Sequence, residues 1–474
     1  MKTYSHKLKF ILSCLAIWSC TERLDEEVFS ELSPSTLLTT EQGLSSLLNA
    51  SYSYAHRAGF AQVFAPLHMG TFTAGEVWGA GGSIENLWVR WIDFTWDSNH
   101  PHIRLTWNVY FDAIRDANLV LDNLDNEAFS SEFREKTEAE AHFIRGWAYS
   151  ELYNHFGGVP LFQTPSDDPL LARASEEETR TFIEQELVMA INGLPNEPES
   201  FGRGAKGVAM SILAKYYLNT KQWQKAADMS NDVINLGQYQ LLPNYSDVFA
   251  IENEGNEEII WALPKISTGP SQGINALLFP PSFPRPFPNN SVYAARTYLF
   301  DDFVNSFEAG DTRTSQIITE YTQNDGTLVQ GLGNDQSHPN KFPWDPNSVG
   351  PNAGNDIPII RYADILLTRA EALNELNGPS QEVIDLINLV RNRANATPLA
   401  LSGFTKEGLR SAILQEREWE FYFEGKARED QIRQGVFISR GQARGKNAAD
   451  HHVLFPIPQV DLDANPALEQ NPGY

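Results

Sequence analysis

The sequence predicts a mostly α-helical protein with about four helix pairs of the tetratricopeptide type as its scaffold. Apolar residues recur at helical spacing through many parts of the 474-residue chain, as in residues 103–123. The segments 205–219 and 222–236 form the clearest pair, with a period near 34 residues and small residues where the helices would cross. A chain of this length can bury a large core.

Glycine and proline mark the ends of several of these helices. The helix predicted over residues 138–156 ends at Gly157-Gly158, and Pro160 lies just beyond. The pair 359–377 and 380–395 turns at Gly378-Pro379. Further helices are predicted to begin near residue 40 and to cover residues 103–123, 176–194, 205–219, 222–236 and 405–435.

Two stretches lack helical periodicity. Residues 57–101 are rich in glycine and aromatic residues, and we expect a long functional loop or irregular strands there. Residues 240–357 combine Pro, Gly and Asn with short β-branched runs such as 258–263, and predict an irregular or β-rich insertion that carries loops. The last forty residues contain several prolines and should lie extended over the surface.

The N-terminus has the pattern of a secretory signal. Lysines at positions 2, 7 and 9 precede an apolar run over residues 10–19, which is too short to span a bilayer. The following Cys20 comes after Ile17-Trp18-Ser19, which resembles a bacterial lipobox. We therefore expect a signal peptide at 1–19, a lipidated Cys20, and a polar tether over residues 20–34. The alternative is an ordinary signal peptide with an incidental cysteine.

Charge and cysteine content exclude several classes of function. The formal net charge is −25, and loss of residues 1–19, which hold three lysines and no acid, would make it −28. Such acidity disfavours nucleic acid and anionic lipid headgroups as binding partners. It also argues weakly against a polyanionic ligand, unless a local basic patch exists. The only cysteines are Cys14 and Cys20, so the mature chain has none for a disulfide, a thiolate nucleophile or a metal site.

Several ordered motifs resemble the SusD/RagB family of outer-membrane lipoproteins from the Bacteroidetes. The matching blocks have the family's order and spacing, although Gln431 and Gln434 replace its usual apolar and aromatic residues. The blocks are residues 143–161 (FIRGWAY to FGGVPL), 360–372 (IRYADILL to AEA), 387–394 (INLVRNRA), 413–435 (ER, EG and RQG) and 455–474 (FPIP to QNPGY).

The resemblance implies a domain division and a function. It implies an N-terminal region at 35–239, the insertion at 240–357 with ligand-facing loops, and a C-terminal family region at 358–474. Such proteins are lipid-anchored at the outer membrane, exposed on the cell surface, where they capture oligo- or polysaccharides. They deliver the glycan to a SusC-like TonB-dependent transporter. A minority of the family handles peptides, so a peptide-binding RagB-like lipoprotein remains an alternative.

Aromatic residues provide the candidate binding site. Tryptophan stacks on the C–H faces of sugar rings, and polar side chains bond to the hydroxyl edges. Four tryptophans lie within nineteen residues of a glycine-rich segment, and we expect at least one to be exposed. In the family, sugar-binding aromatic residues also come from loops later in the chain. The candidate ligand-binding residues are Trp78, Trp88, Trp91, Trp96, Arg285, Tyr293 and Trp344, and the alternative for each is packing in the core.

No catalytic machinery or metal site is predicted. Glu416, Glu420 and Glu424 recur every four residues and could suggest a glycosidase. They would lie on one helix face beside arginines, which favours a structural ion-pair network. The pair His451-His452 has no third ligand at suitable spacing, so we expect surface histidines. A surface glycosidase or peptidase is therefore the less favoured alternative, and no cofactor is expected.

Overall fold

The computed structural model describes residues 37–57, 59–60 and 63–474. The predicted signal peptide, Cys20 and the tether lie outside these residues. Within the described part, no helix is both long and apolar enough to cross a membrane.

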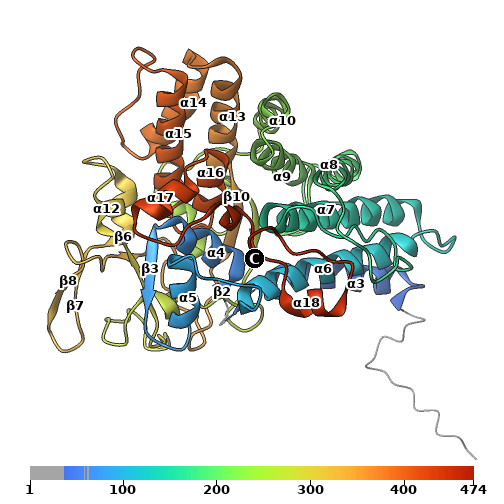
Figure 1. Ribbon diagram of the computed structural model, residues 1–474, viewed down its shortest axis with the longest axis horizontal. Helices are drawn as coiled ribbons and strands as arrows, with labels where there is room; N and C mark the ends of the chain where they lie inside the picture. The colour runs from blue at the N-terminus through green and yellow to red at the C-terminus, as the bar shows by residue number, and fades with distance from the viewer. Residues whose placement is uncertain (1–36, 58, 61–62) are drawn as a thin grey trace, which may run out of the picture.

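Helices dominate the described chain and pack in neighbouring pairs, which confirms the predicted fold class. Helix α3 packs on α6, α7 on α8, α9 on α10, and α13 on α14, while the α10–α13 contact joins the two halves of the scaffold (Figure 1). The bounds are α3 (Glu41–Arg57), α6 (Pro101–Asp122), α7 (Ser131–Phe156), α8 (Glu176–Gly193), α9 (Lys206–Asn219), α10 (Trp223–Asn235), α13 (Tyr362–Asn377), α14 (Gln381–Arg393) and α15 (Lys406–Phe421).

Side-chain caps explain where several of these helices begin. Ser175 and Glu178 form a capping box at the start of α8. Ser130 accepts a hydrogen bond from the Phe133 amide, so α7 begins seven residues earlier than predicted. The added turns are mostly polar and carry little apolar periodicity, which is why the prediction missed them.

Residues 57–101 are more regular than expected. They contain α4 (Ala65–Ala74), β3 (Val77–Ala80) and α5 (Glu85–Ile92), besides the short β1 (Gly59–Phe60) and β2 (Val63–Phe64). All ten residues of α4 are buried. A helix that is covered on every side has no single apolar stripe, so apolar periodicity does not reveal it. The prediction of a loop over these residues was therefore wrong.

The insertion contains short strands joined by loops. Strand β4 (Ile259–Leu263) pairs with β10 (Ile357–Arg361), and β5 (Arg296–Leu299) pairs with β3 of the N-terminal region. Two small ladders complete it: β6 (Ile317–Ile318) with β9 (His338–Pro339), and β7 (Glu320–Thr322) with β8 (Leu328–Gln330). Its helical pieces are α11 (Ile274–Leu278), α12 (Asp301–Val304) and the 3-10 turns Tyr245–Val248, Ile251–Asn253 and Thr312–Gln316.

The C-terminal segment crosses back over the N-terminal helices (Figure 1). It includes α16 (Ala427–Arg433), α17 (Phe437–Ala443), a 3-10 turn at Asp450–Val453 and α18 (Gln459–Ala464). The single helix predicted over 405–435 is interrupted, because Phe423 and Gly425 adopt positive φ between α15 and α16.

Candidate functional site

Trp78 lies on β3, opposite Tyr298 on β5. The two strands are antiparallel, with Trp78 paired to Tyr298 and Ala80 paired to Arg296. The two ring centroids are 4.8 Å apart, and the rings are tilted by 36°. The Trp78 indole N–H donates a hydrogen bond of 2.6 Å to the Asp335 carbonyl. The indole is half-buried and held in position, with part of its surface accessible to solvent.

The aromatic contacts continue from Trp78 across the insertion. His338 lies 4.8 Å from Tyr298 and 5.7 Å from Tyr321, between ring centroids. Tyr321 in turn lies 4.8 Å from Phe283. Trp78, Tyr321 and Trp344 are half-buried, whereas Tyr298 is a buried ring that contacts Trp78 and His338. We call this set the aromatic strip: Trp78, Tyr298, Tyr321 and Trp344.

Buried rings support the far end of the strip. Trp344 is half-buried and stacks on Phe279, with centroids 5.1 Å apart and planes 23° apart. Phe283 lies below the same indole at 6.2 Å and 18°. Both phenylalanines are buried, so the Trp344 ring has a fixed aromatic base. Such a platform suits the flat face of a sugar ring.

Two polar candidates lie in the segment of the insertion that leads from Phe283 to β5. Arg285 is exposed, and its Nη1 donates to the Asn290 carbonyl at 3.1 Å. Tyr293 is 37% exposed, and its amide donates to the Ala276 carbonyl. Arg296 follows Tyr293 by three positions and is half-buried beside Tyr298.

Three of the predicted tryptophans are in the core. The exposed fractions of Trp88, Trp91 and Trp96 are 0%, 0% and 3%. Trp88 stacks on Phe72 at 5.0 Å, and the Trp96 N–H donates to the Tyr474 hydroxyl at 2.8 Å. These three rings therefore pack in the core, and the expectation that they bind ligand is wrong. Glycine-rich neighbours suggested a loop, but α5 turns Trp88 and Trp91 inward.

The histidine expectation is also corrected. His452 is buried and His451 is half-buried, rather than both lying on the surface, and His100 and His102 are buried as well. His100 and His102 have ring centroids 5.5 Å apart and lie beside the core tryptophans. Across the part of the chain that the structure describes, no group of His, Cys, Asp or Glu side chains is arranged to hold a metal ion.

The prediction from sequence missed Tyr298, Tyr321 and Arg296. Arg296 and Tyr298 alternate along one strand, which is a weak period-two signal within residues 293–299. The pairing of β5 with β3 joins segments far apart in sequence, and no local pattern specifies it. Of the predicted residues, Trp78 and Trp344 belong to the strip, and Arg285 and Tyr293 lie in the segment between Phe283 and β5.

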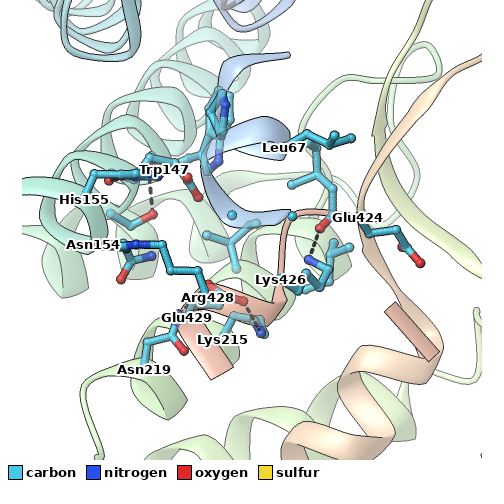
Figure 2. Close-up of a pocket in the computed structure, with 18 of the residues that line it drawn as sticks. Leu67, Trp147, Asn154, His155, Lys215, Asn219, Glu424, Lys426, Arg428 and Glu429 are labelled. Atoms are coloured by element: carbon cyan, nitrogen blue, oxygen red, sulfur yellow. Dashed lines mark hydrogen bonds and ion pairs between the residues drawn. The ribbon is translucent and has the colours of Figure 1, made fainter. Parts of the chain in front are cut away.

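Two cavities lie away from the strip. A polar cavity of about 120 Å³ is lined by α4, α7, α9, β10 and the turn before α16 (Figure 2). In it, Lys215 pairs with Glu429 at 2.7 Å. Burial raises the pKa of the Glu151 carboxyl to about 7, aided by the nearby Glu429 charge. A more open groove of about 620 Å³ lies between α6, residues 160–170 and α18.

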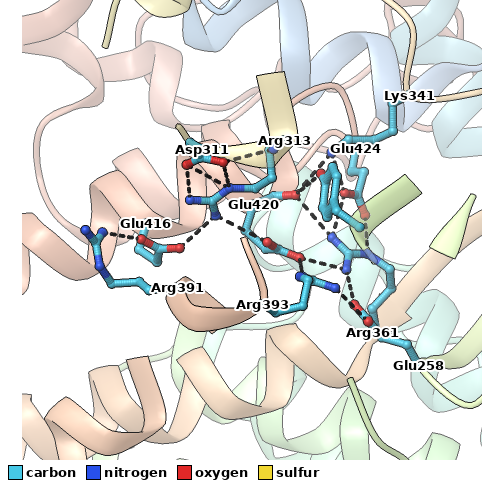
Figure 3. Close-up of polar contacts among 11 residues, drawn as sticks. Glu258, Asp311, Arg313, Lys341, Arg361, Arg391, Arg393, Glu416, Glu420 and Glu424 are labelled. Carbon is cyan, nitrogen blue, oxygen red and sulfur yellow. Dashed lines mark hydrogen bonds and ion pairs between the residues drawn. The ribbon is translucent and has the colours of Figure 1, made fainter. Parts of the chain in front are cut away.

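Glu416 and Glu420 on α15, with Glu424 in the turn after that helix, form the expected structural network. Glu416, Glu420 and Glu424 are buried and face arginines from several elements (Figure 3). The pairs include Arg313–Glu416 at 2.7 Å, Arg361–Glu420 at 3.0 Å, Arg361–Glu424 at 2.9 Å, Arg391–Glu416 at 2.7 Å, Lys341–Glu424 at 2.8 Å and Arg393–Glu420.

Arginine charge determines the ionisation of Glu420. Burial alone would raise the pKa of this carboxyl, but Arg393, Arg361 and Arg313 outweigh burial and hold it well below its usual range. A carboxylate fixed in this way cannot serve as a general acid at neutral pH.

Comparison with known proteins identifies the family. A family model described as the SusD family matches residues 237–474. A SusD-like protein of Formosa agariphila is 31% identical over 420 residues, which cover 78% of this chain and 79% of that protein. The chain belongs to the SusD family. A second model, described as starch-binding and associating with the outer membrane, matches residues 26–218 of this SusD-family protein.

Two further relatives agree with this assignment. The starch-binding protein SusD of Bacteroides thetaiotaomicron is 25% identical over 432 residues, covering 75% of the chain and 76% of that protein. A solved laminarin-binding SusD-like protein superposes with a TM-score of 0.80 at 24% identity, over 92% of this chain and all of that one. The SusD-like fold is thus established for the described residues.

Proposed function

We propose that this SusD-family protein captures an oligo- or polysaccharide at the aromatic strip. The observation that carries the proposal is the arrangement of Trp78 and Trp344, two half-buried indoles held on fixed supports at opposite ends of connected aromatic contacts. Family relatives named for starch and laminarin binding support a glycan as the ligand class.

The binding mechanism follows from the chemistry of the strip. Each exposed ring face can stack on the C–H face of one sugar, and an aromatic contact is worth about 1 kcal/mol. Because Trp78 and Trp344 are already fixed by neighbours, little side-chain entropy is lost on binding. Polar groups beside the rings, such as Tyr293 and Arg285, would bond to hydroxyl edges and select the sugar.

The proposal includes location and a partner. A lipid on Cys20 would hold the protein at the outer membrane, and the tether over residues 20–34 would let the body move above a SusC-like transporter. A captured glycan would favour the closed arrangement of the two proteins only if it binds that state more tightly than the open one.

An enzymatic role has less support than binding. Glycosidases use two carboxyl groups on opposite sides of a cleft. Glu416 and Glu420 instead lie on α15 and Glu424 in the turn that follows it, and all three are buried and paired with arginine or lysine. We therefore propose a binding protein without catalytic activity.

A glycan array probed with the mature chain, with Cys20 replaced by serine, tests the proposal. We expect retention on one group of related glycans and no shortening of the bound oligosaccharides. The same preparation is applied to a peptide array. Retention on peptides in place of glycans would favour the RagB-like alternative, and glycan cleavage would favour an enzyme.

A further inference from the structure

Two arginines beside the aromatic strip have no carboxylate partner. Among the residues that the structure describes, no acidic oxygen lies within 4.0 Å of the Arg285 or Arg296 guanidinium. The Arg285 guanidinium donates to the Asn290 carbonyl, and the Arg296 guanidinium donates to the Ala294 carbonyl and is hydrogen-bonded to the Tyr298 hydroxyl. Buried arginines differ in having carboxylate partners, since Arg313 and Arg361 each contact two or more carboxylates.

Strand register puts Arg296 on the same face as Trp78. Residues two apart on a strand share a face, so Arg296 and Tyr298 on β5 lie on the face that carries Ala80 and Trp78 on β3. Opposite Arg296 there is only the methyl group of Ala80. Burial raises the pKa of Tyr298 and of Tyr321, and the charge of Arg296, which is hydrogen-bonded to Tyr298, opposes both shifts.

Arg285 occupies the other end of the strip. Its hydrogen-bond partner Asn290 donates to the Asp345 carbonyl at 2.9 Å, in the loop that also carries Trp344. Arg285 is exposed and follows Phe283, the buried ring below Trp344, by two positions. One guanidinium therefore accompanies each of the two supported indoles.

Several acidic groups near this face accept backbone amides. Asp335 accepts the Asp301 amide at 2.7 Å, Asp301 accepts the Asp335 amide at 3.1 Å, and Glu85 accepts the Gly81 amide at 2.7 Å. Glu320 adjoins Tyr321 on β7, and alternation along the strand directs it to the opposite face. These carboxylates keep their charge, so the feature that can recognise an anion is the pair of guanidiniums of Arg285 and Arg296, neither of which forms an ion pair among the described residues.

We propose that the aromatic strip selects an acidic glycan, one that carries uronate carboxylates or sulfate esters. This inference rests on the proposed glycan-binding function and names its substrate class. A guanidinium matches carboxylate and sulfate oxygens with two parallel hydrogen bonds. These bonds act at contact distance, whereas charges beyond the screening length of about 8 Å at physiological salt are largely screened.

Titration calorimetry with three hexasaccharides tests the substrate class. The ligands are neutral laminarihexaose, an oligogalacturonate and a sulfated carrageenan oligosaccharide, each added to the mature Cys20→Ser chain. We expect an acidic ligand to bind at least about tenfold more tightly than the neutral one, as charge-assisted hydrogen bonds allow. The oligogalacturonate and carrageenan arms distinguish carboxylate from sulfate as the recognised group.

Variants assign the effect to the arginines. Arg296→Gln and Arg285→Gln should each weaken the acidic ligand about tenfold. Arg296→Lys should recover only part of that loss, because lysine keeps the charge without the planar fork. Arg104→Gln, at an exposed arginine on α6, is the matched control. Melting temperatures confirm that each variant folds.

Each failure has a distinct meaning. Equal affinity for neutral and acidic ligands, or an acidic affinity unchanged by both Arg→Gln variants, would overturn this inference and leave the proposed glycan binding in place. No binding of any oligosaccharide by the unsubstituted chain would overturn both.

Discussion

The indole N–H of Trp78 donates to the carbonyl of Asp335 at 2.6 Å, across 257 positions of sequence. This bond and the contact with Tyr298 fix an indole of the N-terminal region against the insertion. A ring supplied by one region is thereby held in position by another. The strip therefore forms only when the N-terminal region and the insertion pack together.

Trp344→Ala should weaken glycan binding about fivefold, the effect of losing about 1 kcal/mol of stacking. The ring is half-buried on Phe279 and Phe283, so its removal should lower the melting temperature only modestly. Titration calorimetry and a thermal melt measure the two effects. An unchanged affinity would show that the strip ends before Trp344.

Trp91→Ala should lower the stability of the fold and leave the glycan affinity unchanged, the reverse of Trp344→Ala. Trp91 is fully buried, with ring centroids 3.9 Å from His100 and 5.4 Å from Phe455. Truncating a buried aromatic side chain costs about 3–5 kcal/mol of unfolding free energy. Urea denaturation measures that loss, and the affinity per folded molecule should not change. Loss of affinity at unchanged stability would return Trp91 to the binding site.

Glu420→Gln should destabilise the fold strongly. The substitution removes one charge from a buried network and leaves the guanidiniums of Arg361, Arg393 and Arg313 short of a partner. Breaking such a network costs about 3–5 kcal/mol, measurable by urea denaturation. Glu382→Gln, which breaks the more exposed pair with Arg369, should cost less than about 1 kcal/mol. Equal losses would contradict the structural role of Glu420.

Acid should destabilise the protein through its buried histidines. Burial lowers the pKa of His100 to about 3 and that of His102 to about 4, from an ordinary 6.5. The unfolded chain therefore takes up these protons first as pH falls. Stability from these rings is complete above pH 6.5 and is lost from there toward about pH 4 for His102 and about pH 3 for His100, by up to about 1.4 kcal/mol per pH unit for each histidine.

His102→Leu isolates this contribution. Urea denaturation at pH 7, 6, 5 and 4 gives the slope of unfolding free energy against pH for both chains. We expect a smaller slope for the variant between pH 6.5 and 4, because one proton-binding group of the unfolded state is gone. Identical slopes would mean that His102 does not contribute to acid sensitivity.

Cys20→Ala should separate anchoring from recognition. We expect the variant to leave the membrane fraction in cells, because the acyl chains that hold the protein would be absent. The glycan affinity of the purified mature chain should match that of the unsubstituted chain. Retention in the membrane of cells that lack any transporter partner would show that another segment is the anchor.

The sequence was sufficient for the scaffold and insufficient for the site. Apolar periodicity and caps such as Gly378 mark helices, because these signals are local. The family motifs in the C-terminal third identified the fold. Helix α4 was missed because it is buried all round, and the β3–β5 pairing was missed because its strands are distant in sequence. Trp88 and Trp78 have similar glycine-rich surroundings, and only tertiary packing distinguishes them.

Affinity of Trp78→Ala for the glycan selected on the array tests the central claim most directly. The control is Trp223→Ala, a half-buried tryptophan on α10, across the molecule from β3 (Figure 1). The account predicts that titration calorimetry finds at least about a tenfold loss of affinity for Trp78→Ala, because a fixed stacking ring is removed. It predicts no loss of affinity for Trp223→Ala. Equal affinity of both variants and the unsubstituted chain would contradict the account.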